Sequence, residues 1–354
     1  MRIIGSPAYS NKDRNPYNYL LYSSLEKLGV EVLEPWSFSD LRTASIWHLH
    51  WPENFLYERS IIRAWVRFFW LVFKISLTKI FKVKIIWTVH NLTPHKSVSH
   101  FLKKIFYKFF PLICDGFIFL STASKNQSNI WGVRISSSMR AVIPHGSYKS
   151  IVDPKISRQS SRKSLGIDPN KFIFLFFGQI RAYKNVPKLL MEFNQLLMPD
   201  ALLCIVGSTL REQSIAPQIQ SLSGKNDQVI FKDEFVQENE LQQWVAASDV
   251  VVLPYKSVTN SGSALYALSC NRPVIAPKIS ALFEIQKNVG DNCMILYDGE
   301  FNYEHLVNTR SRISNSDLTT IDLSRFDWDL LAKETINFYC RIVTASVSNK
   351  KNAR

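Results

Sequence analysis

The stretch from Val250 to Pro277 constrains the fold of this 354-residue chain more than any other. It predicts a buried strand at Val250 to Leu253, a polar loop at Pro254 to Ser263, and a helix from about Ala264 to Asn271. A second apolar strand follows at Pro273 to Ala276. A strand, loop, helix and strand in this order indicate a parallel sheet. In open parallel sheets ligands bind beyond the carboxyl ends of the strands, which is where the loop is expected to lie.

The end of this loop has the composition of an anion site. Gly262 permits close backbone approach, and Ser261 and Ser263 supply hydroxyl groups. The amides at a helix N-terminus favour an anion by about 0.3–1 kcal/mol at exposed sites. An ordinary loop with a serine N-cap is the alternative interpretation.

Strands alternate with helices along the rest of the chain, which predicts α/β architecture with parallel, doubly wound sheets. In the first half, strands are expected at residues 2–5, 30–33, 46–50, 84–89, 116–120 and 141–143, with helices at 18–28, 57–80 and 99–110. In the second half, strands are expected at 172–177, 201–206 and 229–231, with helices at 185–197, 215–222 and 238–247. Between Ser150 and Pro169 a polar stretch indicates a linker. We therefore expect two doubly wound domains, residues 1–155 and 165–325, facing a cleft.

Composition describes a folded protein with reduced thiols. Apolar residues make up 46% of the chain and charged residues 20%. Five widely spaced cysteines match neither a disulfide framework nor a metal site. Because the chain opens directly with a strand, no cleaved signal peptide is expected.

Positive charge is concentrated in the first half. Residues 1–150 contain 20 Lys+Arg and 8 Asp+Glu, so 20 − 8 = +12 of the total +14 lies there. Residues 59–114 contain eleven basic residues and no acidic one. The first half is expected to face nucleic acid, a phospholipid surface or a phosphorylated substrate.

Two predicted helices carry these basic residues on one side. In the first helix the basic stripe includes Trp70, and its members are Arg59, Arg63, Arg67 and Lys74, while Phe68, Leu71, Val72 and Ile75 lie away from it. Three internal charges argue against a transmembrane helix. In the second helix Lys103, Lys104, Tyr107 and Lys108 share one side, and Leu102, Ile105, Phe106 and Phe109 share the other. Both patterns favour helices lying on an anionic membrane. The alternative is two core helices with solvated basic faces.

The strand at 172–177 ends in a second candidate anion site. Gly178 frees the backbone there, and Arg181 and Lys184 follow in the loop. An arginine fork and a lysine point charge suit a diphosphate. A surface loop with two solvated cations is the alternative. The loop has neither the Walker pattern nor the Rossmann fingerprint, which disfavours nucleotide hydrolysis and NAD binding.

Several motifs together resemble family 4-like (group 1) glycosyltransferases of the GT-B fold, in particular bacterial enzymes of surface-polysaccharide synthesis. In the second half these motifs are residues 177–185, 204–208, 235–241, 247–254 and 267–276. In the first half Trp47-His-Leu-His-Trp-Pro52 and residues 87–95 are similar to that bacterial branch. Residues 326–345 resemble the C-terminal helix that crosses back to the first domain in that fold. The resemblance covers nearly the whole chain.

The resemblance implies transfer of a sugar from a nucleotide-diphosphate donor held by the second domain to an acceptor held by the first. It places Gly178, Arg181 and Lys184 at the donor diphosphate and His90 at the donor sugar. The remaining donor-site candidates are Phe235, Val236, Asn260, Ser261, Gly262, Ser263 and Tyr266. Such sites work without a cofactor or divalent ion, and we expect no metal ion and no Asp-x-Asp motif to hold one.

The chain departs from this family at one place. Two glutamates eight positions apart are replaced by Val258 and Tyr266. The donor sugar and the stereochemistry therefore stay open, and Asn260 and Ser261 become candidates to hold the sugar. An inverting reaction would need a general base near the acceptor. The candidates are His90, Glu53 and His95, with His145 weaker, and Asn15, Tyr17 and His50 complete the acceptor-side set.

We therefore expect a glycosyltransferase on the inner face of the cytoplasmic membrane that elongates a lipid-diphosphate-linked saccharide in exopolysaccharide, capsule or O-antigen synthesis. Nucleic acid is not an expected partner. A transferase with a soluble acceptor is one alternative. The other is a GT-B protein that has lost catalysis and binds an anionic membrane or nucleic acid.

Overall fold

The computed structural model describes residues 1–13, 15–34, 37–92, 98–210, 212–224, 226–314 and 320–351. Two compact units account for them. Unit 1 comprises residues 1–146 together with the C-terminal segment from Phe326, and unit 2 comprises residues 147–325. Each unit has its own sheet.

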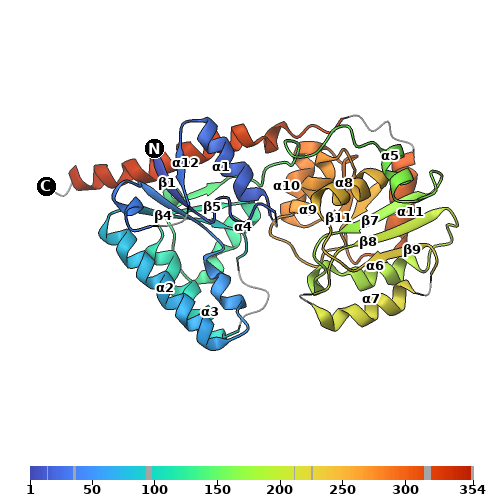
Figure 1. Ribbon diagram of the computed structural model, residues 1–354, viewed down its shortest axis with the longest axis horizontal. Helices are drawn as coiled ribbons and strands as arrows, with labels where there is room; N and C mark the ends of the chain where they lie inside the picture. Colours follow the sequence, from blue (N-terminus) through green and yellow to red (C-terminus); the bar gives the residue numbers. More distant parts are fainter. Residues whose placement is uncertain are drawn as a thin grey trace. The chain divides into compact units, whose positions relative to one another are not determined.

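The sheet of unit 1 is parallel and has the strand order β2-β1-β3-β4-β5-β6 (Figure 1). Its strands are β1 (Arg2–Ser6), β2 (Glu31–Leu33), β3 (Ile46–His50), β4 (Lys84–Val89), β5 (Gly116–Phe119) and β6 (Arg140–Val142). Helices cover both faces, since α1 (Tyr17–Lys27) packs with α12 (Trp328–Lys351) on one face and α2 (Ile61–Ile80) lies with α3 (His100–Ile113) on the other. The short helix α4 (Thr122–Gln127) follows β5.

Helix α12 belongs to unit 1 because of one apolar stripe. Its buried residues recur every three to four positions: Leu331, Ala332, Thr335, Phe338, Tyr339 and Ile342. The helix approaches the sheet backbone so closely that a Cβ on Gly116 would lie 2.9 Å from the Phe338 ring. The chain thus returns from unit 2 to unit 1, as the fold prediction stated.

The sheet of unit 2 is also parallel and has the order β12-β11-β10-β7-β8-β9. Its strands are β7 (Phe172–Phe177), β8 (Ala201–Val206), β9 (Val229–Lys232), β10 (Val250–Val252), β11 (Val274–Pro277) and β12 (Met294–Tyr297). Its helices are α5 (Arg158–Ser164), α6 (Val186–Phe193), α7 (Ala216–Ser223), α8 (Glu238–Ala247), α9 (Gly262–Ser269), α10 (Ser280–Val289) and α11 (Tyr303–Ser314). The predicted α/β class with two doubly wound parallel sheets is confirmed.

The predicted linker at 150–169 is wrong, because its polar residues form α5. A capping box starts the helix, with Ser157 Oγ accepting a hydrogen bond from Ser160 N. Arg162 is buried, and it donates to the carbonyls of Pro169, Lys171 and Ala247 and pairs with Asp249 at 2.8 Å. The stretch is therefore part of unit 2. The polar composition suggested a linker. The polar guanidinium of Arg162 is nevertheless buried, because its hydrogen-bond donors find partners inside unit 2.

Candidate functional site

The carboxyl end of β7 brings three of the predicted donor residues together in unit 2. Gly178 has φ +96°, a conformation that L side chains rarely adopt. A Cβ built on it would lie 3.4 Å from Lys184 Nζ and 3.6 Å from Ser263 Oγ. The neighbouring Gly207 has no room for a side chain, since its Cβ would lie 2.0 Å from the Gly178 carbonyl oxygen. Glycine is thus required at positions 178 and 207, close to where the Lys184 and Ser263 side chains approach each other.

Lys184 is a buried cation in this cluster. It is 8% exposed, and its Nζ lies 5.8 and 5.6 Å from the ring centroids of Phe176 and Tyr255. Burial, and then the charge of Arg181, lowers the pKa of Lys184 to about 8. In the described part of the chain no carboxylate pairs with Lys184, so a bound anion would stabilise its charge.

Arg181 lies beside Lys184 but has an acidic neighbour. Its Nη1 lies 3.6 Å from Glu212 Oε2, a loose contact between two mostly buried side chains. A guanidinium held this way is oriented without being fully neutralised. Glu212 was not predicted, and no motif marks it.

The start of α9 completes this group of predicted donor residues around Lys184 (the donor cluster). Ser261 is its N-cap and accepts a hydrogen bond from Ala264 N at 3.2 Å, so the helix begins two residues before the predicted Ala264. The Tyr255 hydroxyl hydrogen-bonds with the side chains of Ser263 and Ser261. The amide end of α9 and the two serines therefore lie on the side of Lys184.

The other donor candidates are spread around this cluster. Tyr266 is buried, with its ring 5.8 Å from that of Phe177 and 5.3 Å from that of Tyr148. Its Oη has no hydrogen-bond partner in the described residues. Asn260 and Val236 are partly exposed, and Phe235 is exposed in the loop before α8.

In unit 1 the carboxyl ends of β3 and β4 gather a cluster of aromatic and imidazole rings. His50 Nδ1 and His90 Nε2 share a hydrogen bond of 3.0 Å, and His50 Nε2 lies 2.9 Å from Tyr22 Oη. The Trp51 ring stacks on His90 at 4.0 Å. Tyr17 makes edge contacts with His90 and with His145 at 4.9 and 4.8 Å. Four predicted residues, His50, His90, His145 and Tyr17, are thus brought together.

The imidazoles of this cluster are neutral at physiological pH. Burial lowers the pKa of His48 to about 3 and that of His145 to about 4, and it places the pKa of His50 and His90 well below the usual range. His145 Nδ1 donates to the Gly146 carbonyl at 2.7 Å, which fixes its tautomer. The cluster therefore offers neutral donors and acceptors of hydrogen bonds.

Glu53 is a second titratable group near this end of β3. It lies in the 3-10 turn Pro52–Tyr57 that follows Trp51, and it is 1% exposed. Its Oε2 has no hydrogen-bond partner within the described ranges. Burial raises the pKa of Glu53 to about 7, the range in which a carboxyl group exchanges protons at working pH.

The two remaining acceptor candidates are Asn15 and His95. Asn15 precedes α1, and its Oδ1 accepts a hydrogen bond from Tyr17 N at 3.2 Å. His95 lies outside the described residues.

Three ring-cluster residues escaped the sequence analysis. Trp51 has φ 50° and stacks on His90, and its place in the 47–52 motif could have singled it out. Tyr339 Oη hydrogen-bonds with His48 Nδ1 at 2.6 Å across 291 positions of sequence, and Tyr22 contacts His50 from α1. No local signal predicts the last two contacts.

The sequence contains an Asp-x-Asp tripeptide, at Asp327 to Asp329. Asp327 Oδ1 accepts hydrogen bonds from the backbone amides of Asp329 and Leu330, so it caps α12. The described residues contain no group of three His, Cys, Asp or Glu side chains that could hold a metal ion.

Known proteins resemble both the sequence and this architecture. Residues 171–307 match the family model for glycosyl transferases group 1. The GDP-mannose:glycolipid 4-beta-D-mannosyltransferase of Xanthomonas campestris pv. campestris is 27% identical over 335 residues, which is 92% of this chain and 88% of that protein.

Two solved structures share the fold along almost the whole chain. Sucrose-phosphate synthase of Thermosynechococcus elongatus has a TM-score of 0.71 at 16% identity, covering 98% of this chain and 100% of that one. Anabaena HepE, in complex with UDP and glucose, has a TM-score of 0.63 at 17% identity with the same coverage. The chain has the GT-B fold, and along nearly its whole length it is similar to glycosyltransferases. The predicted resemblance is confirmed, and the same similarity supports the predicted glycosyltransferase class.

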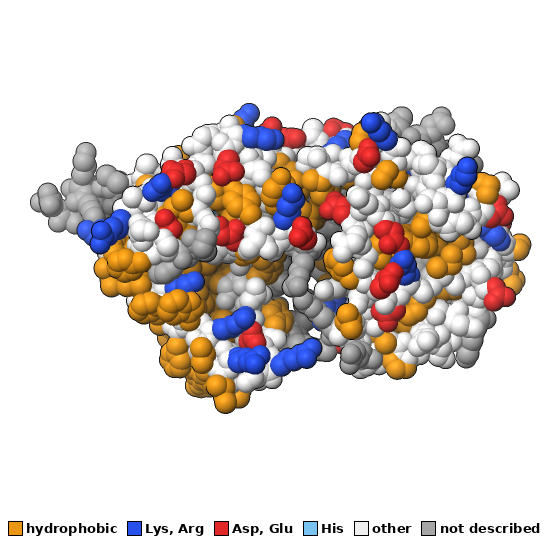
Figure 2. Space-filling view, in the orientation of Figure 1, with side chains coloured by type: hydrophobic (Ala, Val, Ile, Leu, Met, Phe, Trp, Pro, Cys, Tyr) orange, Lys and Arg blue, Asp and Glu red, His pale blue; other side chains and the backbone are white. Residues whose placement is uncertain are grey.

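The surface of unit 1 over α2 is strongly apolar. Helix α2 begins at Ile61, after the 3-10 turn, and not at Tyr57. Trp70, predicted within the basic stripe, is 54% exposed, and Val72, predicted to lie away from that stripe, is 42% exposed. The other exposed large side chains of the helix are Ile61, Ile62, Val66, Phe69, Phe73 and Ile80. Figure 2 shows hydrophobic side chains gathered at this edge of unit 1.

The basic residues predicted to lie along this helix have different surroundings. Arg67 pairs with Glu58 at 2.6 Å. Lys74 is half-buried, 5.5 Å from the centroid of the Trp70 ring. Arg59 and Arg63 are both exposed. None of the described helices is both long enough and apolar enough to cross a membrane.

Helix α3 also differs from its predicted pattern. Lys104 and Lys108 are exposed, and Lys103 is partly exposed. Tyr107, predicted on the basic side, is 7% exposed, and Phe109, predicted on the apolar side, is 50% exposed. The helix continues to Ile113 with Pro111 inside it, which turns one more apolar residue, Leu112, to the surface.

Proposed function

We propose that this glycosyltransferase transfers a sugar from a nucleotide-diphosphate donor to a hydroxyl of a lipid-diphosphate-linked saccharide at an anionic membrane surface. The observation that carries the proposal is the buried Lys184, held beside Arg181, Ser263 and the start of α9 with no carboxylate on it in the described chain. The glycolipid acceptor and GDP-mannose in the name of the Xanthomonas relative support both substrate classes.

The donor cluster accounts for the departure of the leaving group. A nucleoside diphosphate leaves as an anion, and its charge must be stabilised when the bond to the sugar breaks. Lys184 and Arg181 supply cations, and the amides of α9 supply dipoles. We propose that these groups bind the diphosphate without a divalent ion. Such metal-free binding fits a site where two protein cations already lie close together.

We further propose that Glu53 is the general base of an inverting transfer. Its carboxylate takes the proton from the acceptor hydroxyl, the hydroxyl oxygen bonds to C1 of the sugar, and the bond from C1 to the phosphate oxygen breaks. Its pKa of about 7 suits this exchange. The role requires acceptor binding to uncover Glu53, which is 1% exposed. His90 and His50 would orient the substrates as neutral hydrogen-bonding groups.

The exposed apolar side chains of α2 support attachment to the membrane. An interfacial helix buries large side chains in the lipid boundary and keeps basic residues near the headgroups. Helix α2 offers Trp70, Phe69 and Phe73 to the surface, with Arg63 exposed among them. A peripheral position on the inner face of the cytoplasmic membrane follows from this proposal.

One observation favours a second candidate, a GT-B protein without catalysis. Positions 258 and 266 hold Val258 and Tyr266, where the family resemblance places glutamates. In that case vesicles would bind without sugar transfer.

Incubation with sugar nucleotides and lipid-linked saccharides in EDTA distinguishes the two candidates. Mass spectrometry should detect addition of one sugar to the acceptor by the wild-type protein and none by Lys184→Met. Binding to anionic vesicles, with no transfer from any GDP-, UDP-, TDP- or CMP-linked donor, would favour the second candidate.

A further inference from the structure

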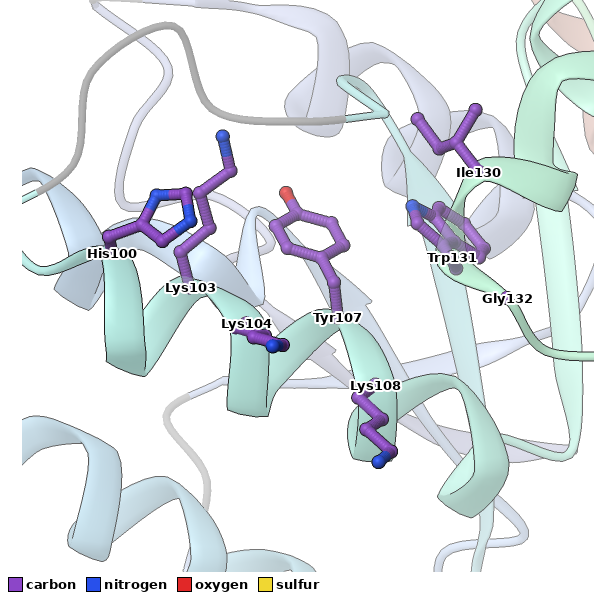
Figure 3. Close-up of a pocket in the computed structure, with 8 residues that line it drawn as sticks. All are labelled: His100, Lys103, Lys104, Tyr107, Lys108, Ile130, Trp131 and Gly132. Atoms are coloured by element: carbon purple, nitrogen blue, oxygen red, sulfur yellow. The ribbon is translucent and has the colours of Figure 1, made fainter.

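A pocket of about 500 Å³ lies beside α3 in unit 1, apart from the ring cluster described above. Helix α3 forms one side, and the 3-10 turn Ser128–Trp131 forms the other (Figure 3). Its lining residues are His100, Lys103, Lys104, Tyr107, Lys108, Ile130, Trp131 and Gly132. Three of these are lysines and none is acidic, so the pocket suits an anion.

Tyr107 gives the pocket a hydroxyl group that lacks a protein partner. Its side chain is 93% buried (7% exposed), its ring packs edge-on against Phe106 at 5.1 Å, and its Oη has no hydrogen-bond partner among the described residues. Figure 3 shows the hydroxyl and the Lys103 side chain rising from the same side of α3, whereas Lys108 points the other way. A buried hydroxyl without a partner is unfavourable, and an anionic oxygen beside Lys103 would satisfy it.

The opposite wall is apolar and fixed in place. Trp131 Nε1 donates to the Leu92 carbonyl at 2.9 Å, and the indole stacks on Trp87 with the ring centroids 5.0 Å apart. Ile130 beside it is exposed. On α3 itself Phe101, Phe109 and Leu112 are exposed. The pocket therefore joins a cationic, hydroxyl-bearing side to an apolar edge.

We propose that this α3 pocket binds the diphosphate of the lipid-linked acceptor, with Lys103 and Tyr107 on the phosphate oxygens and Ile130 and Trp131 against the start of the lipid chain. The inference rests on the proposed function and names the part of the acceptor that unit 1 recognises. A compact lysine charge with a hydroxyl donor suits a terminal or bridging phosphate group. The apolar wall excludes a free sugar phosphate as the preferred ligand, since such a ligand would leave Ile130 exposed to water.

Calorimetric titration of farnesyl diphosphate tests this proposal. The titration uses the full chain carrying Lys184→Met, which weakens diphosphate binding at the donor cluster. Farnesol, which lacks the diphosphate, and inorganic diphosphate, which lacks the chain, are the paired probes. We expect farnesyl diphosphate to bind at least tenfold more tightly than either. Lys103→Ala and Tyr107→Phe should each weaken its binding at least tenfold, and Lys27→Ala, an exposed lysine on α1, should leave it unchanged.

Three results would overturn the proposal. Farnesol could bind as tightly as farnesyl diphosphate, which would leave the lysines without a role. Lys103→Ala and Tyr107→Phe could both bind farnesyl diphosphate like the parent. Tyr107→Phe could weaken binding to phosphatidylglycerol vesicles as much as to farnesyl diphosphate, which would assign the pocket to the membrane surface in general.

A nucleotide titration of the otherwise unmodified chain separates this inference from the proposed function. If a nucleoside diphosphate binds while the α3 pocket fails these tests, only the pocket assignment is lost. If no nucleoside diphosphate binds, the proposed function is lost as well. Because Tyr107→Phe keeps the buried ring, loss of the fold does not confuse the result, and a melting temperature near that of the parent confirms this.

Discussion

Both units have buried ionisable groups near the carboxyl ends of their parallel sheets. These groups are charged at neutral pH in unit 2 and uncharged in unit 1. In unit 2 Lys184 is buried, yet its pKa falls only to about 8, so it keeps its charge at neutral pH. In unit 1 burial lowers the pKa of His48 to about 3 and that of His145 to about 4, so the cluster is uncharged. The difference indicates that the donor cluster of unit 2 suits an anion, whereas the ring cluster of unit 1 suits a neutral group such as a sugar hydroxyl.

The largest expected effect is the pH dependence of stability that the buried Glu53 of unit 1 causes. Its folded pKa of about 7 is raised above the reference value of 4.5, so the folded state holds its proton more tightly than the unfolded state. The free energy of unfolding should therefore fall as pH rises from about 4.5 to 7 and stay level above that. At 1.36 kcal/mol per pKa unit the loss is about 3 kcal/mol.

Glu53→Gln should remove this pH dependence and make the protein more stable at pH 8, while reducing transfer at least a hundredfold if Glu53 is the base. Denaturant titrations at pH 5, 6, 7 and 8 measure the stability. The exposed Glu300→Gln is the control and should keep the wild-type slope. An unchanged slope in Glu53→Gln would contradict the assignment of the raised pKa.

Lys184→Met tests whether the buried cation of unit 2 binds a nucleoside diphosphate. Loss of a charge-assisted contact to a phosphate oxygen should cost about 2 kcal/mol, roughly a thirtyfold weaker affinity for a nucleoside diphosphate. The fold should not suffer, because the lysine is buried with no carboxylate on it in the described residues. Calorimetry measures the affinity, and Lys188→Met, a lysine on α6 paired with Glu192, is the matched control.

The pH dependence of donor binding follows from the same lysine. Lys184 must be protonated to bind an anion, and in the free protein it loses its proton as pH rises through about 8. Affinity for a nucleoside diphosphate should therefore be level below pH 7 and fall by up to tenfold per pH unit above pH 8. Titrations at pH 8.5 in buffers of different ionisation enthalpy should show proton uptake on binding, and Lys184→Met should show none.

The smallest expected effect lies in the contact between α12 and the ring cluster. Tyr339→Phe removes the hydroxyl that hydrogen-bonds with His48 Nδ1 at 2.6 Å. A buried hydrogen bond contributes about 1 kcal/mol, so the unfolding free energy should fall by about that amount. Tyr303→Phe, at an exposed ring outside the cluster, is the control. An equal loss in both variants would remove any special role for the contact.

Much of the fold followed from local patterns. Helix α8 has the predicted bounds, Glu238–Ala247, and strands β3, β4, β7 and β8 match their apolar runs. Helix α5 was missed because its polar sequence is stabilised by Arg162 contacts that only the folded unit supplies. Tyr107 and Phe109 exchanged places relative to the predicted faces of α3, since periodicity gives the faces of a helix but not what covers them.

The candidate site was predictable only where a motif marks a strand end. Gly178, Lys184 and Ser263 follow predicted strands or start a predicted helix, and the structure brings them together. The contacts of His48 with Tyr339 and of His50 with Tyr22 join strand β3 to two helices that are distant in sequence, α12 and α1. Only tertiary packing creates these contacts, so no spacing in the sequence predicts them.

The most direct test of this account is a calorimetric titration of GDP and UDP into the wild-type protein in EDTA at pH 7, repeated with Lys184→Met. The account predicts that at least one of the two nucleotides binds without a divalent ion and that Lys184→Met weakens that binding about thirtyfold. Binding that appears only when Mg²⁺ or Mn²⁺ is added, or that is equally strong in Lys184→Met, would contradict the claim that unit 2 holds the donor diphosphate with its own buried cation.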